Sequence, residues 1–209
     1  MMVKYIAEFI GTFFLVLTVG MVVIEPGVGT LAPLAIGSIL AIMIYAGGHI
    51  SGAHYNPAVT LAVWIRGKCD TKDVVLYIVA QIAAGIAAAC LTLFLKSNPT
   101  VSAMTPNVLP ALLAEFLFTF ALCFVVLNVA TAKSTEGNSY FGLVIGLTVL
   151  VGAFAVGGIS GGVFNPAVAI GITLMGLSAA QDIWIFLVAN LLGGVVAAVT
   201  FKIVNPSDE

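Results

Sequence analysis

The sequence predicts an all-α membrane protein in which six transmembrane helices and two re-entrant half-helices form an inverted repeat. Three observations lead to this prediction: a very hydrophobic composition, six apolar stretches long enough to cross a bilayer, and two halves that repeat each other. Hydrophobic residues make up 61% of the 209 residues and charged residues 8%, with a net charge of −2. So few charges cannot cover a soluble globule of this size. The net negative charge also excludes a basic nucleic-acid-binding protein.

The spanning helices are predicted from length and apolar character. A helix needs about 20 predominantly apolar residues to cross the hydrocarbon core. The first such stretch is not a cleaved signal peptide, because Glu8 lies inside it and no Ala-x-Ala site follows with a polar mature domain. We expect six transmembrane helices, at Ile6–Ile24, Leu31–Gly48, Val74–Leu95, Val108–Thr131, Tyr140–Gly157 and Ile183–Val204.

Two further apolar stretches, Pro57–Ile65 and Pro166–Leu174, are too short to span the membrane. Each begins with Asn-Pro, which favours a helix start because Asn caps free backbone N–H groups and Pro fits the first turn. The Gly- and Ser-rich segments before them, 47–52 and 157–162, predict extended backbone. Irregular backbone at membrane depth must be buried in protein or line a wet cavity, so two such segments predict a cavity. We expect its lining to include the backbone of Gly48, His49, Ile50 and Gly161.

The two halves of the chain repeat one another. Ala7-Glu8-Phe9 recurs 107 positions later as Ala114-Glu115-Phe116, and Asn56-Pro57-Ala58-Val59 recurs 109 positions later as Asn165-Pro166-Ala167-Val168. Each half holds three spanning helices, an odd number, so the second half enters the membrane from the opposite side. We therefore expect one channel domain, 1–209, whose inverted repeats cover about 1–96 and 108–209 and meet at the site. Two further pairs share the second offset: Gln81 with Asn190, and Gly85 with Gly194.

Positive charges are distributed very unevenly over the connecting segments. If the N-terminus lies inside, six of the seven Lys and Arg residues lie inside and only Lys96 lies outside. Because cytoplasmic loops carry an excess of Lys and Arg, we expect both termini in the cytoplasm and the chain in a cell or inner membrane. The inner cations are then Lys4, Arg66, Lys68, Lys72, Lys133 and Lys202.

The N-termini of the two half-helices should meet near the bilayer centre. Each carries roughly half a positive charge from its peptide dipoles, so the centre is electropositive without an ionised side chain. Asn56 and Asn165 can offer amide N–H groups there, and the backbone before them can offer carbonyls. A neutral solute can exchange its water for these groups, whereas a cation or a hopping proton meets a barrier. This midplane site comprises Asn56, Pro57, Ala58, Asn165, Pro166 and Ala167.

Three motifs resemble the aquaporin and aquaglyceroporin superfamily. They are the doubled Asn-Pro-Ala, the segment His49-Ile50-Ser51-Gly52-Ala53-His54 before its first copy, and Ala7-Glu8-Phe9-Ile10-Gly11-Thr12-Phe13. The resemblance covers nearly the whole chain. It implies a homotetramer in the lipid bilayer with one pore per subunit, passive flux of water or small neutral solutes, and no cofactor.

The resemblance also implies roles for polar residues inside the membrane. Glu8 and Glu115 would accept backbone N–H bonds from the re-entrant loops, a scaffold role that we favour over a proton relay. His54 would brace loop carbonyls, and a metal site with His49 is disfavoured because no Cys or carboxylate is spaced to join them. Gln81 and Asn190 would support the loops. The glycines expected to pack helices closely are Gly85, Gly193 and Gly194.

In the family, a constriction beside the double Asn-Pro-Ala sets selectivity. Counting from the two Asn residues as the family pattern does places Ile36, Ala153, Gly162 and Val168 at this selectivity filter. The family usually has Arg at the position of Val168, and water-selective members combine that Arg with an aromatic residue and a His. The resemblance therefore implies a wider and more apolar filter here, open to polyols, urea, ammonia or undissociated boric or arsenous acid, as well as water.

Other function classes can be weighed against this passive channel. A secondary transporter can contain an inverted repeat, but transporters usually place an ion-coupling charge beside their broken helices. No charged residue lies between Gly47 and Ile65 or between Gly137 and Gln181. An enzyme would need a nucleophile with its base, paired carboxylates or a metal cluster at the cavity, and no such set is present in the sequence. A sealed structural tetramer of the same fold is a further alternative, which a flux assay would exclude.

Overall fold

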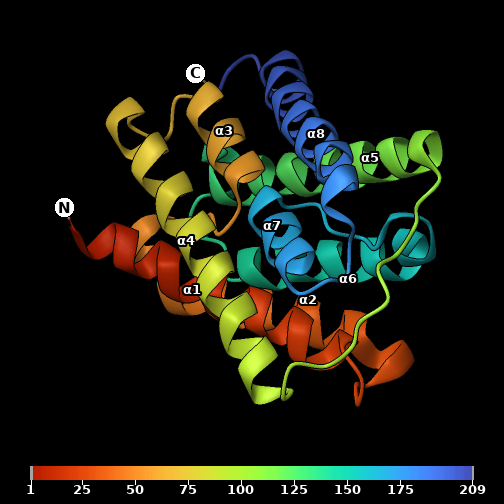
Figure 1. Cartoon of the computed structure of the whole chain (residues 1–209). Coiled ribbons are helices and arrows are strands. Elements are labelled where there is room, and N and C mark those ends of the chain that lie inside the picture. Colours follow the sequence, from red (N-terminus) through yellow and green to blue (C-terminus); the bar gives the residue numbers. More distant parts are fainter. Residues whose placement is uncertain (1, 209) are drawn as a thin grey trace.

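The computed structural model describes residues 2–208, and this part of the chain forms eight α-helices. Two short helices, α3 and α7, lie among six longer ones (Figure 1). Single 3-10 turns at Gly29–Leu31, Lys133–Thr135 and Ala180–Asp182 precede or follow the long helices. The helices are α1 (Met2–Val23), α2 (Ala32–Ser51), α3 (Pro57–Ile65), α4 (Thr71–Leu95), α5 (Val108–Ala130), α6 (Phe141–Ser160), α7 (Pro166–Leu174) and α8 (Ile183–Val204).

The prediction of six spanning helices is confirmed. Six helical segments of 20 to 25 residues are long and apolar enough to cross a membrane. They differ from the predicted stretches mainly at their ends, because polar turns continue the helix beyond the apolar run. Thus α1 already begins at Met2 and α4 at Thr71. Both half-helices have the predicted bounds, Pro57–Ile65 and Pro166–Leu174.

The prediction of extended backbone over 47–52 and 157–162 is wrong for most of both segments. Helix α2 continues to Ser51 and α6 to Ser160. Each ends only at a glycine with left-handed backbone, Gly52 at φ 86° and Gly161 at φ 95°. The N–H of each glycine still bonds the carbonyl four residues earlier, over 2.9 Å, and the helix stops because a left-handed residue cannot continue it. The helical residues of these segments are 47–51, which include Gly48, His49 and Ile50, and 157–160.

Each half-helix packs against a long helix of the other repeat, α3 against α8 and α7 against α4. A Cβ at Gly194 of α8 would lie 2.7 Å from the carbonyl oxygen of Ala58, and one at Gly85 of α4 would lie 2.7 Å from that of Ala167. Gly193 approaches the backbone of α5 in the same way, at 2.8 Å. The predicted packing role of these glycines is confirmed, because no side chain fits between the backbones. The two repeats therefore interlock, and each holds the other's half-helix.

Candidate functional site

Helices α3 and α7 begin in the same way, each capped by an asparagine. Asn56 has extended backbone, with φ −158°, and its side-chain oxygen accepts a hydrogen bond from the N–H of Ala58 over 2.8 Å. Asn165, with φ −156°, accepts from the N–H of Ala167 over 2.9 Å and from that of Val168 over 3.4 Å. A proline fills the first position of both helices, where no N–H is needed. These local sequences explain why each half-helix starts where it does.

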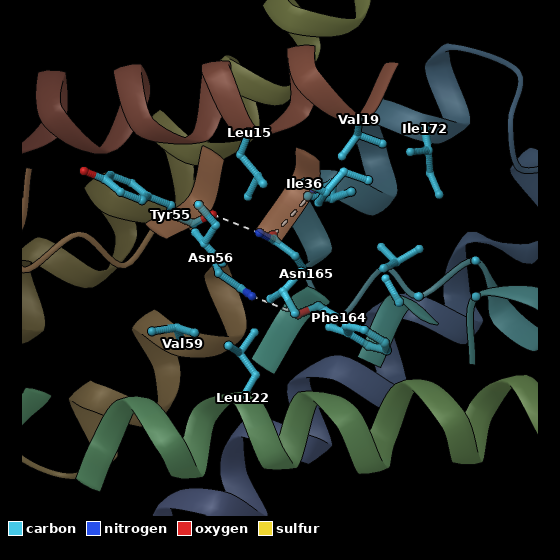
Figure 2. Close-up of a pocket in the computed structure, with 18 of the residues that line it drawn as sticks. Leu15, Val19, Ile36, Tyr55, Asn56, Val59, Leu122, Phe164, Asn165 and Ile172 are labelled. Carbon is cyan, nitrogen blue, oxygen red and sulfur yellow. Dashed lines mark hydrogen bonds between the residues drawn. The ribbon is translucent and has the colours of Figure 1, made fainter. Parts of the chain in front are cut away.

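Each cap is hydrogen-bonded to the opposite loop, at the backbone carbonyl of the residue before the other cap. The amide of Asn56 donates to the carbonyl of Phe164 over 2.8 Å, and the amide of Asn165 donates to the carbonyl of Tyr55 over 2.9 Å (Figure 2). Each amide nitrogen carries two hydrogens, so one remains available after this bond. Both asparagines line the cavity described below. The N-termini of the half-helices, and their positive dipole ends, therefore meet at one place.

The residues that supply these two carbonyls have unusual backbone. Tyr55 and Phe164 have φ 50° and φ 49°, the left-handed region that bulky residues rarely adopt. The buried ring of Tyr55 lies against Gly11 of α1, and its hydroxyl donates to the carbonyl of Met43 over 3.0 Å. The ring of Phe164 packs on an aromatic ring of α5, with centroids 5.5 Å apart. Ring burial offsets the backbone strain and aims each carbonyl at the opposite asparagine.

A fully buried carboxylate holds each loop just before its capping asparagine. Glu8 of α1 and Glu115 of α5 each accept two backbone N–H bonds, of 2.9 and 2.7 Å, and one serine hydroxyl bond of 2.7 Å. Such bonds satisfy N–H groups that would otherwise be buried without a partner. The donors are His54, Tyr55 and Ser51 for Glu8, and Val163, Phe164 and Ser160 for Glu115.

The first loop also carries a polar cluster. Gln81 donates to Glu8 over 2.8 Å and to the hydroxyl of Thr60 over 3.0 Å. Thr60 donates its own proton to the carbonyl of Asn56 over 3.0 Å. The hydroxyl can then only accept from the Nδ1–H of His54, which is 3.2 Å away. This assigns the proton of a neutral His54 to Nδ1.

Among residues 108–208, no equivalent cluster supports the second loop. The positions that correspond to His54 and Thr60 are Val163 and Ala169, which carry no polar side-chain atom. Asn190, the counterpart of Gln81, accepts a hydrogen bond from the hydroxyl of Thr119 over 3.0 Å. The polar support on this side is therefore smaller.

A cavity of about 340 Å³, hereafter the central cavity, contains the asparagine pair in its wall. Apolar side chains of α1, α2, α5 and α6 form most of the lining, as Figure 2 shows for Leu15, Ile36 and Leu122. Among residues 2–208, none of the lining residues is Asp, Glu, Lys or Arg. A cavity without ionised groups stabilises a desolvated ion poorly, but it can receive an uncharged solute.

The residues expected at the filter all line the central cavity: Ile36, Ala153, Gly162 and Val168. Of the six midplane residues, only Asn56 and Asn165 line it. The Pro and Ala residues of both motifs are buried, and the alanine carbonyls are packed against α8 and α4. The asparagines are therefore the members of the repeated motif that a solute in this cavity can contact.

A second cavity of about 650 Å³, hereafter the vestibule, adjoins the first. Gly48 and His49 line the vestibule as helical residues, Gly161 lines the central cavity, and Ile50 lines neither. Within the part of the chain that the structure describes, no group of three His, Cys, Asp or Glu side chains could hold a metal ion. The vestibule differs from the central cavity in its charged lining residues, Lys68, Lys133 and Glu136. The two cavities share Ile44, Ala53, His54, Val126 and Ile145.

The C-terminal tail is tied to the end of α3. The buried Arg66 pairs with Asp208 at 3.0 Å and lies over the ring of Phe201, 4.9 Å from its centroid. The backbone N–H of Lys133 donates to the same carboxylate over 2.9 Å. This N–H and the Arg66 guanidinium hold the pKa of Asp208 below its ordinary value. The tail therefore links α3 to the segment after α5 that lines the vestibule.

Sequence reasoning missed some lining residues. Ser102, Met104 and Leu177 line the central cavity from two connecting segments, which the backbone bond from Met104 N–H to Leu177 carbonyl joins over 3.0 Å. These segments are far apart in the sequence, and no motif marks their contact. Thr60 was also missed, although a signal existed: it follows the first Asn-Pro-Ala-Val, whereas Ala169 follows the second.

Comparison with known proteins agrees with this architecture. Residues 1–204 match the family described as Major intrinsic protein. The chain is 37% identical to glycerol uptake facilitator protein-like 6 of Lactiplantibacillus plantarum, over 98% of this chain and 99% of that protein. It is 34% identical to nodulin-26 of Glycine max, over 99% of this chain and 79% of that protein. The structure of the aquaglyceroporin from Plasmodium falciparum has the same fold, with a TM-score of 0.81 at 24% identity over 98% of this chain and 97% of that one.

Proposed function

Because the chain belongs to the major intrinsic protein family and is a passive membrane channel for water and small solutes, we propose that it conducts small uncharged solutes and excludes ions and protons. The candidate solutes are glycerol-like polyols, urea, ammonia and metalloid acids, together with water. The proposal assigns no enzymatic step, cofactor or bound metal to this flux.

The observation that carries the proposal is the pair of asparagine caps, each hydrogen-bonded to the opposite loop, in a cavity wall where residues 2–208 contribute no charged side chain. Two positive dipole ends converge there, and each asparagine keeps one N–H for a passing solute. A neutral solute replaces lost water contacts with these donors and with loop carbonyls. A cation meets the positive ends without a compensating carboxylate, and a hopping proton meets the same barrier.

The small residues at the proposed filter are consistent with the passage of solutes larger than water. We propose that Ile36, Ala153, Gly162 and Val168 form the filter. Two of these four positions offer a methyl group or no side chain, and none offers a ring or a guanidinium. Selection by hydrogen-bond donors is therefore weak at the filter, and selection by size and polarity predominates.

The same proposal includes the residues that support the loops, the orientation of the chain in the membrane and its oligomeric state. Glu8, Glu115, His54, Gln81 and Asn190 act as its scaffold rather than as solute sites. We propose one channel domain of two inverted repeats, at about 1–96 and 108–209. The cations at the vestibule support a cytoplasmic location for that mouth and for both termini, in a cell or inner membrane. The assembly we propose is a homotetramer with one pore in each subunit.

The test is stopped-flow light scattering on proteoliposomes with water, glycerol, urea and boric or arsenous acid, combined with a proton-sensitive dye and a potassium gradient. We expect solute flux that increases linearly with concentration, needs no ion gradient, and is accompanied by no proton or potassium leak. Flux that saturates or depends on an ion gradient would indicate a secondary transporter instead. Absence of flux for every solute would indicate a sealed structural protein.

A further inference from the structure

One wall of the central cavity contains two adjacent residues without a side chain. Gly161 and Gly162 lie there with φ 95° and φ 66°, a backbone conformation that residues with a Cβ rarely adopt. A Cβ at Gly162 would also lie 3.0 Å from the Cα of Ala153. Ala153 contributes only a methyl group, so the bulk beside the two glycines comes from neighbouring side chains: Val163 and Phe164 of the same loop, at 3.7 and 3.5 Å from these Cβ points, and Met104 of another segment.

Met104 belongs to the segment between α4 and α5, which crosses from one helix to the other without a helix or strand of its own (Figure 1). The Cε of Met104 lies 3.2 Å from the point that a Cβ on Gly161 would occupy. Ser102 and Met104 line the cavity, whereas the exposed Ala103 and Thr105 do not. This alternation is typical of extended backbone, in which successive side chains point to opposite sides.

The backbone of Met104 is held in place. Its N–H donates to the carbonyl of Leu177 over 3.0 Å, and residue 104 forms a parallel bridge with Ser178, just after α7. Ser178 is itself buried, with 2% of its surface exposed. The fixed backbone and the flexible side chain together place a thioether against Gly161, next to the filter position Gly162.

We propose that Met104 is a specificity-determining residue of this channel, whose side chain forms the movable wall that limits solute width beside Gly161 and Gly162. The inference rests on the proposed function, because it presupposes that small solutes pass through the central cavity. An unbranched thioether has three rotatable bonds and only a weak acceptor, so it discriminates by size rather than by hydrogen bonding.

The first test compares Met104→Ala with Thr105→Ala, a matched control at the next residue, which is exposed and does not line the cavity. In proteoliposomes, Met104→Ala should raise the ratio of glycerol to water permeability by about tenfold, the lower end of the discrimination that one methylene group gives in an apolar pocket. Met104→Phe should lower the ratio, Met104→Leu should keep it near wild type, and Thr105→Ala should leave it unchanged. Equal ratios for Met104→Ala, Met104→Phe and wild type would overturn the proposal.

The second test acts on folded protein, so it does not depend on the folding of the alanine variant. Met104→Cys is placed in a chain whose three native cysteines, Cys69, Cys90 and Cys123, are replaced by Ser or Ala. Thiol reagents of increasing size are then added to reconstituted protein, with the cysteine-free chain as control. Solute flux should fall with reagent size and recover on reduction. Complete labelling with unchanged flux would overturn the proposal.

The two proposals fail in different ways. A wild-type protein that conducts none of the solutes contradicts the proposed function. A wild-type protein that conducts them, but whose selectivity does not respond to residue 104, contradicts only the assignment of Met104.

Discussion

The two re-entrant segments, 52–66 and 161–175, have the same frame but different side chains. Each starts at a left-handed glycine, is held by a buried carboxylate, and ends in a half-helix capped by asparagine. Corresponding bonds to Glu8 and Glu115, and the two bonds between the caps, agree to within 0.1 Å. This agreement indicates that the frame tolerates little change on either side.

The differences lie at positions around that frame. The first segment carries His54, Thr60 and Arg66, and the second has Val163, Ala169 and Met175 at the corresponding places. The first half-helix therefore ends in an ion pair with Asp208, whereas the second ends in the buried Met175. The comparison teaches that the shared bonds fix how the two loops face each other, whereas the surrounding residues give the first segment polar contacts that the second lacks.

The strongest test of the shared frame removes its carboxylates. Glu115→Ala leaves two buried N–H groups and a serine hydroxyl without their acceptor, at about 1–3 kcal/mol for each lost partner. We expect a loss of at least about 3 kcal/mol in the free energy of unfolding, measured by denaturant titration in mixed micelles. Glu8→Ala should lose more, because Gln81 also bonds Glu8. A smaller loss at Glu8 than at Glu115 would contradict the added role of the polar cluster.

The next test asks whether the two caps are equivalent for flux. Asn56→Asp replaces a donor by a carboxylate that faces the carbonyl of Phe164, and Asn165→Asp does the same toward Tyr55. Either variant should lower solute flux by about tenfold, which corresponds to about 1.4 kcal/mol of added barrier, or should admit cations. Light scattering and a potassium-leak assay measure the two effects. Wild-type flux and ion exclusion in both variants would refute the facing half-helices as the barrier.

The polar cluster of the first segment can be tested alone. Thr60→Ala removes the acceptor of His54 and one acceptor of Gln81, both buried. We expect a loss of about 1–2 kcal/mol in the free energy of unfolding. Thr173→Ala is the control, because this hydroxyl donates only to a carbonyl within its own half-helix α7. Equal losses in the two variants would show that the cluster adds nothing beyond a local bond.

Val168 and Val59 occupy equivalent positions and both line the central cavity. Val168→Arg should fill space beside Gly162 and Ala153 and should lower the ratio of larger-solute to water permeability by about threefold, or about 0.65 kcal/mol. Val59 lies on the other side of the asparagine pair, so Val59→Arg should change the ratio of larger-solute to water permeability less. Both ratios are read from the same stopped-flow panel, with subunit integrity checked by gel filtration. An unchanged or higher ratio in Val168→Arg would contradict the assignment of Val168 to the filter.

The smallest effect is expected at the ion pair that only the first segment has. The folded-state pKa of Asp208 is lowered by the Lys133 N–H and by Arg66, so the folded protein holds this carboxyl ionised more strongly than the unfolded chain does. The contribution of Asp208 to the free energy of unfolding is complete above the ordinary Asp pKa, and it is lost as pH falls toward the lowered pKa of the folded state. Asp208→Asn should therefore lower Tm slightly at pH 7 and should match wild type at the lowest pH. A constant difference in Tm at all pH values would contradict this origin.

The sequence by itself determined the membrane class, the six spanning helices, the bounds of both half-helices and the pairing of the repeats. These features depend on local physics: apolar length, asparagine caps, proline at the first helical position, and the parity of the spans. The residues expected at the filter could be placed only by counting in a family pattern, yet all four line the central cavity. The ends of α2 and α6 could not be predicted from the local sequence, because a glycine-rich helix and a glycine-rich loop have the same composition.

Only the tertiary structure decided which segments meet at the central cavity. The bonds between Asn56 and Phe164, between Asn165 and Tyr55, and between Met104 and Leu177 join segments far apart in the chain, and no periodicity in the sequence encodes them. The half-helices pack on the opposite repeat at Gly85 and Gly194, and this packing brings the two asparagine caps to the same place. The local sequence therefore determines the caps and half-helices, and close backbone packing determines how they face one another.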